Sequence, residues 1–173
     1  LNIGAPGTAK STLLRAAEEL APRSMYASGK GASAAGMTAA AVRDDFGSSE
    51  WALEAGALVL ANKGIACVDE LYKVDDDARS SMHDALESQR VNVNKAGINA
   101  TLPAQTSLLA AGNPKYGRFD KHASESLSEQ INLGPTLLSR FDLIFMLEDN
   151  PEREQDTDVS KHMVSGREKG KLH

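Results

Sequence analysis

Short apolar runs alternate with amphipathic segments along most of the chain. This pattern predicts an α/β domain with a mostly parallel sheet flanked by helices. Apolar runs bounded by polar or turn-forming residues predict strands at residues 1–3, 25–27, 65–68, 106–111 and 142–147. Apolar positions at helical spacing predict helices at residues 12–20, 54–62, 75–89 and 137–138. Three aspartates begin the helix at 75–89, where the helix dipole favours negative charge.

The helical spacing also predicts which side chains are buried. Helix 12–20 is expected to bury one apolar face, made of Leu13, Ala16, Ala17 and Leu20. The apolar positions of helix 75–89 are Ala78, Met82, Ala85 and Leu86. His83 falls on the polar side of that helix and has no second metal-type ligand at a useful spacing, so we expect it to be solvated.

One segment has the alternation of an antiparallel hairpin. Apolar and polar residues alternate over residues 90–95 and again over residues 98–102. The turn between them is Lys95-Ala96-Gly97, which predicts that Lys95 lies at the hairpin tip.

A second hairpin is expected around the turn-forming residues 44–49. These residues lie between two short segments of strand character, at 41–43 and 50–53. Trp51 would then stand near the base of the hairpin. We interpret Trp51 as a packing residue, with a platform for a nucleotide as the alternative.

Composition limits the kinds of protein that the chain can be. It has 173 residues, of which 41% are hydrophobic and 25% charged, as in an ordinary soluble globular domain. The net charge of −5 argues against a basic surface all over, but a few cations at one place can still contact nucleic acid. No apolar run approaches the roughly 20 residues needed to span a membrane. The single Cys67 excludes an internal disulfide and is expected to be a buried thiol.

A glycine-rich turn joins the first predicted strand to helix 12–20, and this order is the frame of a phosphate-binding P-loop. Backbone N–H groups would face the phosphates, Lys10 would reach the β- and γ-oxygens, and Ser11 would ligate Mg²⁺. The usual motif has glycine where this chain has Ala9, so a glycine-rich helix cap is the alternative. The candidate nucleotide-binding residues are Gly4, Pro6, Gly7, Thr8, Ala9, Lys10, Ser11 and Thr12.

A pair of acids follows the apolar strand at residues 65–68. In P-loop ATPases the first acid of such a pair holds Mg²⁺ through water, and the second polarises the attacking water. We therefore expect Asp69 to contribute to a magnesium site and Glu70 to be catalytic. Two solvated acids at a strand end are the alternative.

Two more polar residues lie where their chemistry fits such a site. Asn113 follows the strand at 106–111, where its amide can position water, although Asn-Pro is also a common turn. Arg140 precedes the last predicted strand and can neutralise charge on a γ-phosphate as an arginine finger does. A surface arginine paired with Asp142 is the alternative. The P-loop, the pair of acids, Asn113 and Arg140 occur in the order expected for a P-loop ATPase. Because the probabilities of four chance matches multiply, the four signals together are much stronger than any one of them.

Together these motifs resemble the minichromosome maintenance (MCM) replicative helicases, a branch of the AAA+ ATPases. That family characteristically has alanine before the P-loop lysine, so Ala9 fits it. The resemblance covers residues 2–154, which is most of the chain. It rests on the segments 4–11, 53–61, 69–71, 95–98, 111–117 and 138–145.

The resemblance implies an AAA+ core with a helix-2 insert at residues 40–53 and a pre-sensor hairpin carrying Lys95. It implies that Arg140 projects into the ATP site of a neighbouring subunit in a ring, typically a hexamer of one or of related MCM subunits. Lys95 would contact the backbone of single-stranded or forked DNA in the channel. The expected function is ATP-driven translocation along single-stranded DNA with duplex unwinding. The resemblance implies that one subunit's half of the ATP and Mg²⁺ site consists of Lys10, Ser11, Asp69, Glu70 and Asn113.

The chain also departs from the family pattern. Ala5 replaces an aspartate common in this loop, which removes no phosphate ligand. Residues 1–154 are expected to be the ATPase core with a truncated first strand, and residues 155–173 the start of the C-terminal lid. Relative to the family pattern, we expect the chain to lack the N-terminal DNA-binding domain and most of the lid. We therefore expect the isolated chain to be a weak or inactive helicase.

Other functions stay open at this point. One alternative is another AAA+ ATPase with a helix-2 insert, of the chelatase or remodelling type. Another is a ring-assembly module that binds ATP without hydrolysis, against which Glu70, Asn113 and Arg140 argue. The acids around Asp69 favour an archaeal source and a location in the cytoplasm or nucleoid, with a eukaryotic nucleus as the alternative. No membrane association is expected.

Overall fold

The computed structural model describes residues 1–43, 51–120, 125–126 and 129–147. Its centre is a sheet of five parallel strands in the order β2-β5-β8-β1-β9. This confirms the α/β class and the mostly parallel sheet that the sequence predicts. The strands are β1 (Asn2–Gly4), β2 (Ser24–Ser28), β5 (Ile65–Asp69), β8 (Ser107–Gly112) and β9 (Phe145–Leu147). The strand expected at residues 142–147 is therefore shorter than predicted.

The central strands are buried on both faces, and alternate side chains belong to two hydrophobic cores. In β5, Ala66 and Val68 belong to the larger core, whereas Cys67 belongs to the smaller one. In the neighbouring strand β8, Ala110 and Ala111 divide in the same way. This period of two follows from the alternating direction of side chains along a strand. Cys67 is fully buried, as expected, and its burial raises the pKa of the thiol.

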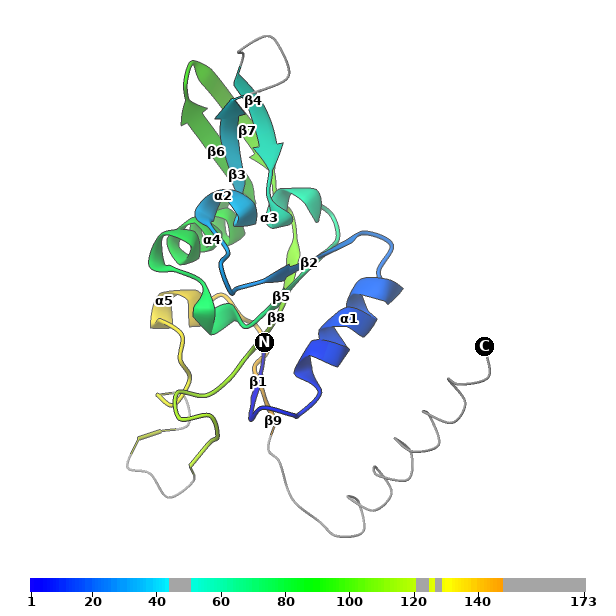
Figure 1. Ribbon diagram of the computed structural model, residues 1–173, viewed down its shortest axis with the longest axis vertical. Coiled ribbons are helices and arrows are strands. Elements are labelled where there is room, and N and C mark those ends of the chain that lie inside the picture. The colour runs from blue at the N-terminus through cyan, green and yellow to red at the C-terminus, as the bar shows by residue number, and fades with distance from the viewer. Residues whose placement is uncertain (44–50, 121–124, 127–128, 148–173) are drawn as a thin grey trace.

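The helices cover the two faces of the sheet unequally (Figure 1). The first, α1, lies against β5 and β8 on the side of the smaller core, while the other helices contribute to the larger core. A helix at residues 54–62 is reduced to one turn because β4 occupies residues 54–55. The helices are α1 (Lys10–Leu20), α2 (Ala34–Met37), α3 (Ala57–Leu60), α4 (Asp76–Ser88), α5 (Pro135–Leu138) and the 3-10 turn η1 (Leu71–Lys73).

The prediction for the buried face of α1 is right for Ala17 and wrong for its other three residues. Leu14 is fully buried and Ala17 is half-buried against the sheet. The reason is the position of Lys10 at the first turn, because residues at i, i+4 and i+7 share one face of a helix. Once Lys10 faces the loop, Leu14 and Ala17 must face the sheet. Three residues expected to be buried are exposed instead: Leu13 (50%), Ala16 and Leu20 (85%).

Helix α4 agrees with its prediction apart from one residue. The Asp75 carboxylate caps the helix by accepting a hydrogen bond from the Ala78 backbone N–H at 2.7 Å. Met82 and Ala85 are buried as expected. His83 is not solvated, because its side chain is only 17% exposed and has partners described below.

Two antiparallel hairpins extend from one end of the molecule and lie side by side (Figure 1). Both were predicted. The second has Lys95 as the last residue of β6 and a turn at Ala96 and Gly97, both with positive φ. In the first, Trp51 is paired with Arg43 next to residues 44–50, so it lies at the outer end and not near the base. The strands are β3 (Ala39–Arg43), β4 (Trp51–Ala55), β6 (Arg90–Lys95) and β7 (Ile98–Pro103).

The segment after β8 returns to the body of the domain through Gln130, whose side chain is completely buried. The Gln130 amide donates to the Asp120 carbonyl at 2.8 Å and accepts from the Asp120 backbone N–H at 2.7 Å. These bonds fix the chain on its way to α5. Among the residues with described coordinates, none forms a helix that is long and apolar enough to cross a membrane.

Candidate nucleotide site and the opposite edge of the sheet

The predicted P-loop joins β1 to α1 and closes around the ammonium group of Lys10. The Lys10 Nζ atom donates to the carbonyls of Gly4 and Ala5 at 2.9 and 2.6 Å and to the Thr8 hydroxyl at 3.1 Å. The turn needs two left-handed residues, Gly7 (φ 88°) and Ala9 (φ 56°). Glycine adopts this conformation freely, whereas alanine does so at a cost of roughly 1–2 kcal/mol.

The loop has the features of a phosphate cradle. The first N–H groups of a helix have no partner within the helix, and here they belong to Lys10, Ser11 and Thr12. A Cβ added at Gly7 would meet nothing within 4 Å, so the tip of the loop is open. Burial lowers the pKa of Lys10, while the nearby charge of Asp69 raises it. Cation and N–H groups together suit a polyphosphate.

Asp69 and Glu70 stand at the C-terminal end of β5. The Asp69 carboxylate accepts hydrogen bonds from the Tyr26 hydroxyl at 2.9 Å and the Glu70 backbone N–H at 2.8 Å. Burial and the bond to Asp69 raise the pKa of Tyr26 to about 12. Glu70 has a left-handed backbone (φ 51°), and its carboxylate forms an ion pair with Lys73. Both acids therefore have specific partners, which the alternative of two solvated acids at a strand end does not include.

Asn113 follows β8, and its side chain is also engaged. The Asn113 amide donates to the Tyr72 hydroxyl at 3.4 Å. Tyr72 and Lys73 belong to the same 3-10 turn, so one short element contacts both Glu70 and Asn113.

The strand order brings these residues to one edge. Strand β8 lies between β5 and β1, and all three run parallel, so their C-terminal ends lie at the same edge of the sheet. Lys10 follows β1, Asp69 ends β5 with Glu70 directly after it, and Asn113 follows β8. The crevice outside the carboxyl ends of parallel strands is where α/β sheets bind ligands.

The residues present are compatible with Mg²⁺ alongside a nucleotide. The ion prefers oxygen ligands and usually keeps several waters, with one or two protein ligands and the phosphates completing its shell. The Ser11 hydroxyl, at the start of α1, and the Asp69 carboxylate supply such oxygens. Within the described part of the chain, no group of three or more His, Cys, Asp or Glu side chains forms a metal cluster. Any magnesium would therefore depend on the phosphates as well.

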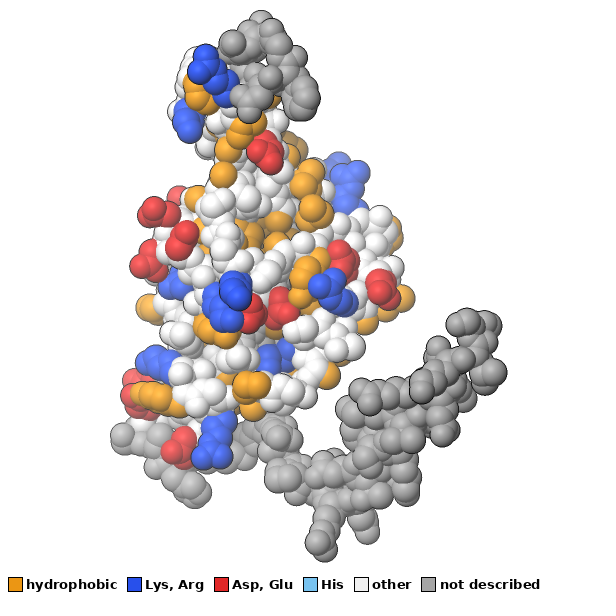
Figure 2. Space-filling model, viewed as in Figure 1, with side chains coloured by type: hydrophobic (Ala, Val, Ile, Leu, Met, Phe, Trp, Pro, Cys, Tyr) orange, Lys and Arg blue, Asp and Glu red, His pale blue; other side chains and the backbone are white. Residues whose placement is uncertain are grey.

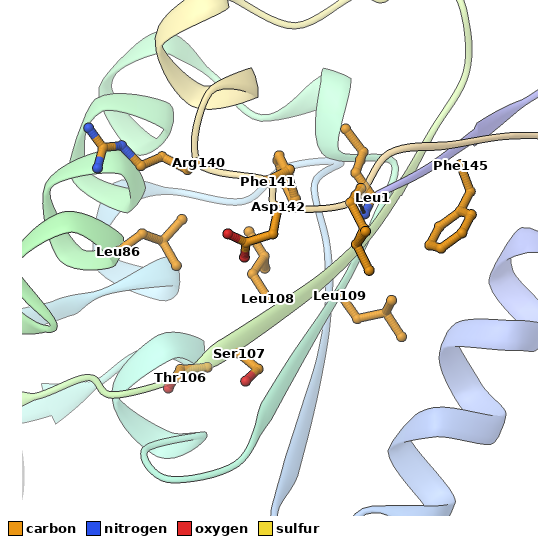
Figure 3. Close-up of a pocket in the computed structure, with 11 residues that line it drawn as sticks. Leu1, Leu86, Thr106, Ser107, Leu108, Leu109, Arg140, Phe141, Asp142 and Phe145 are labelled. Atoms are coloured by element: carbon orange, nitrogen blue, oxygen red, sulfur yellow. Dashed lines mark hydrogen bonds between the residues drawn. The ribbon is translucent and has the colours of Figure 1, made fainter.

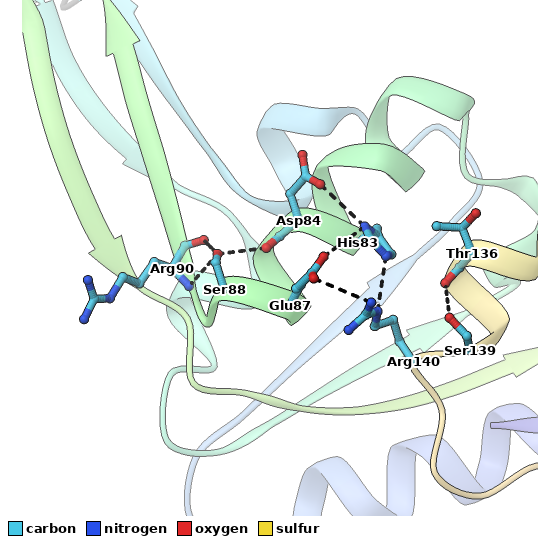
Figure 4. A network of polar contacts seen from close by, with 8 residues as sticks. All are labelled: His83, Asp84, Glu87, Ser88, Arg90, Thr136, Ser139 and Arg140. Atoms are coloured by element: carbon cyan, nitrogen blue, oxygen red, sulfur yellow. Dashed lines mark hydrogen bonds and ion pairs between the residues drawn. The ribbon is translucent and has the colours of Figure 1, made fainter.

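Arg140 lies at the opposite edge of the sheet. It comes before β9, which is parallel to β1, so it is at the N-terminal edge while the P-loop is at the C-terminal edge. The Arg140 Nε donates to His83 Nε2 at 3.2 Å, and a terminal nitrogen lies 3.7 Å from a carboxylate oxygen of Glu87 (Figure 4). The alternative pairing with Asp142 is not the one that the structure has.

Beside Arg140 the same edge is hollowed by an open cavity of about 400 Å³. Leu86 from α4 and Leu108 and Leu109 from β8 line it, and the segment from Arg140 to Leu143 borders it (Figure 3). The Arg140 side chain points away from this cavity toward α4. The two edges of the sheet thus carry two separate groups of polar residues.

Lys95 belongs to neither edge, because it lies at the outer end of the hairpin β6–β7. Basic side chains are visible at this end of the molecule (Figure 2). In β6 the buried Val91 and Val93 alternate with the exposed Arg90, Asn92 and Asn94, and Lys95 at the end of the strand is exposed as well. Its tip is therefore a surface feature, as the sequence predicts.

Sequence reasoning missed the residues that hold the predicted ones in place. These are Tyr26, Tyr72, Lys73, His83 and Glu87. Only Lys73 carried a local signal, since it is three residues after Glu70 and such spacing allows an ion pair. Tyr26 and Tyr72 meet their partners through the strand order, and His83 and Glu87 meet Arg140 through the docking of α4. No short pattern encodes either arrangement.

Strand order, P-loop and paired acids define a P-loop nucleotide-binding domain. Comparison with known proteins specifies the family: the family model described as the MCM P-loop domain matches residues 1–167. The chain is 51% identical over 164 residues to the minichromosome maintenance protein MCM of Saccharolobus solfataricus. It is 46% identical over 169 residues to the DNA replication licensing factor mcm5 of Dictyostelium discoideum, and 46% over 161 residues to mcm7 of Schizosaccharomyces pombe.

The chain therefore belongs to the MCM family. These three alignments cover 95%, 98% and 93% of the chain but only 23%, 22% and 21% of the relatives. The chain thus spans about a fifth of the length of the curated relatives it matches. The family match supports nucleotide binding by the P-loop edge. It favours the MCM family over the alternative of a chelatase-type or remodelling AAA+ ATPase.

Proposed function

We propose that this chain is the ATP-hydrolysing motor core of an MCM-type replicative helicase. The observation that carries the proposal is the convergence of Lys10, Asp69, Glu70 and Asn113 at one edge of three adjacent parallel strands. Arg140, which hydrolysis also requires in this scheme, is at the other edge. We extend the proposal to the domain boundaries, with the core at residues 1–154 and the lid beginning in residues 155–173, which lie outside the described part of the chain.

The P-loop edge would bind ATP through the N–H groups of α1 and the ammonium group of Lys10. On binding, the triphosphate would replace the loop carbonyls that Lys10 contacts in the free chain. Ser11 and Asp69 would hold Mg²⁺, which neutralises phosphate charge when bound. Glu70 would accept the proton of the attacking water, and Asn113 would orient that water. Both would first exchange their present contacts with Lys73 and Tyr72 for water.

Arg140 would complete the ATP site of a neighbouring copy. It cannot serve its own P-loop, because the sheet separates the two edges. A head-to-tail arrangement of copies joins one edge of each to the opposite edge of the next, and such heterologous contacts form a ring when the rotation between copies closes. We propose a hexameric ring of this chain or of related subunits, as the family resemblance implies.

The hairpin end would contact DNA. Lys95 at an exposed tip provides a phosphate contact that does not depend on sequence, which suits translocation along a single strand. The named relatives include a minichromosome maintenance protein of Saccharolobus solfataricus and a DNA replication licensing factor of Dictyostelium discoideum. We therefore propose action on chromosomal DNA, in the nucleoid of an archaeon or in a eukaryotic nucleus.

The proposal can be tested in a chimera. In it, this chain replaces the matching segment of the Saccharolobus relative, so that assembly is possible. Single-stranded DNA should stimulate its ATPase activity, and Lys95→Ala should abolish the stimulation and weaken DNA binding. Lys63→Ala, at an exposed lysine before β5, is the matched control and should change neither. If DNA leaves the ATPase rate unchanged, or if Lys95→Ala binds DNA normally, the helicase proposal fails.

The second candidate is an assembly module that binds ATP without hydrolysing it. The contacts of Glu70 with Lys73 and of Asn113 with Tyr72 favour this second candidate, because they engage both side chains elsewhere than in the nucleotide site. Glu70→Gln separates the candidates. In a motor this variant keeps ATP binding and loses hydrolysis, whereas in an assembly module the chimera has no hydrolysis to lose.

A further inference from the structure

The two hairpins meet at their outer ends through one pair of side chains. Trp51 begins β4 and Lys95 ends β6, and strands β3 and β6 are in contact. The Lys95 Nζ atom lies 5.9 Å from the centre of the Trp51 ring. This distance is within the range of a cation–π interaction, which is modest at an exposed site.

Trp51 is not a packing residue of either core. Its side chain is 42% exposed, and neither hydrophobic cluster includes it. Residues 51–54 are all exposed, so β4 does not point Trp51 into a buried layer. Burial in a core therefore does not explain why a large aromatic ring stands partly exposed beside a cation at this position.

We propose that Trp51 is a stacking platform for one unpaired nucleobase, beside the phosphate that Lys95 contacts. A nucleotide carries a base and a phosphate on the same sugar, so a ring and a cation in contact match its two ends. Stacking on an aromatic side chain accepts any base, because every base has a π face. This inference rests on the proposed DNA contact of Lys95 and adds a selection for single strands, since paired bases are already stacked.

The positions of the cations around Trp51 also support its role as a stacking platform. Lys95 contacts Trp51 across the two hairpins, so the cation is held near the ring before any DNA binds. Arg43 is paired with Trp51 in the hairpin β3–β4 and adds a second cation at the same end. Aromatic and basic side chains that follow one another along a surface are the arrangement by which proteins bind single strands.

The test uses the fact that Trp51 is the single tryptophan of the chain. Its fluorescence is recorded while the chain is titrated with a thymidine oligonucleotide of about 15 nucleotides, a length within the usual range of site sizes. A second titration uses an abasic oligonucleotide of the same length, which keeps the phosphates and lacks the bases. Binding of both is measured independently by the anisotropy of a label on the oligonucleotide.

Stacking predicts that the thymidine oligonucleotide quenches Trp51, and that the abasic one binds with little quenching. Trp51→Ala should weaken binding of the thymidine oligonucleotide about 10-fold and leave the abasic one unchanged, while Trp51→Phe retains most of the affinity. The control Trp51→Phe/Leu20→Trp moves the tryptophan to the exposed end of α1 and should show no quenching. Circular dichroism and thermal melting establish that each variant is folded.

Three results would overturn the inference or its basis. Equal quenching by both oligonucleotides, or equal weakening of both by Trp51→Ala, means that Trp51 only positions Lys95. Thymidine binding without quenching means that no base reaches the ring. If Lys95→Ala leaves the binding of both oligonucleotides unchanged, the proposed DNA contact fails, whatever Trp51 does. If neither oligonucleotide binds the folded chain, that contact and the inference fail together.

Discussion

The two edges of the central sheet hold their polar residues in different ways. At the C-terminal edge, Lys10 is fixed by the oxygens of Gly4, Ala5 and Thr8, all within six residues along the chain. At the N-terminal edge, Arg140 is held by His83, which is 57 residues away in the sequence. One edge is organised by its own loop, whereas the other depends on the docking of α4 beside it.

This difference has a functional meaning in the proposed ring. A P-loop that is complete within one short segment can bind nucleotide in a single copy. An arginine that projects from the far edge contributes only when a second copy is present. In the proposed ring the chain would thus have two half-sites, and each could be altered without altering the other.

The largest effect is expected at the P-loop edge. Lys10→Ala removes a buried cation and should weaken ATP binding to the single chain about 100-fold, as the loss of a charge-assisted contact with phosphate implies. Calorimetric titration with a non-hydrolysable ATP analogue measures the effect. Arg140→Ala is the matched variant at the other edge and should bind the analogue normally. Equal weakening by both variants would contradict the separation of the edges.

A smaller effect is expected from the contacts that orient Arg140. His83→Ala removes the acceptor of the Arg140 Nε–H, so the ATPase rate of the chimeric ring should fall about 10-fold. His83→Gln retains an acceptor near the position of Nε2 and should recover most of the rate. ATP binding to the single chain should be the same in all three proteins. A wild-type ATPase rate in His83→Ala would show that Arg140 needs no support from α4.

The strain in the P-loop predicts a stability effect at one edge only. Ala9 has a left-handed backbone, so Ala9→Gly should raise the free energy of unfolding by about 0.5–1 kcal/mol, after allowance for the greater freedom of glycine in the unfolded chain. Urea unfolding measures the change. Ala21→Gly, at the other end of α1 with φ −80°, is the control and should not stabilise the chain. A destabilised Ala9→Gly variant would mean that the loop is not strained at this residue.

The smallest effect concerns the proton of Tyr26. Burial and the bond to Asp69 raise the pKa of Tyr26 from its ordinary value of 10 to about 12. A raised pKa means that the folded state holds the proton more tightly, so the stabilisation is present below pH 10 and is lost as the pH rises toward 12. Tyrosinate absorbance should show one late step, which Tyr26→Phe removes. If the step that Tyr26→Phe removes lies near pH 10 instead of near 12, burial and the bond to Asp69 do not raise the pKa of Tyr26.

The sequence predicts the P-loop edge well because its information is local. A strand, a glycine-rich turn and a helix are each encoded within a few residues, and the parallel strand order then brings Asp69 and Asn113 to the same edge. Hairpin alternation places Lys95 equally well. Whether these residues perform the roles proposed for them stays a prediction.

The errors have physical causes that a local pattern cannot contain. Helix α1 has leucines on two faces, and the rotation that buries Leu14 is decided by the inward direction of Lys10. The sequence predicts a solvated His83 because nothing within its own helix reveals the approach of Arg140. It predicts a packing role for Trp51 because a single strand cannot show that a second hairpin lies beside it.

The central claim is that each ATP site is shared between two copies, and subunit mixing tests it most directly. Lys10→Ala and Arg140→Ala chimeras, each inactive alone, are mixed in equal amounts and allowed to reassemble. Random assembly joins an intact P-loop to an intact Arg140 at about a quarter of the interfaces, so about a quarter of the wild-type ATPase rate should return. A mixture that stays as inactive as either variant alone would contradict the shared site.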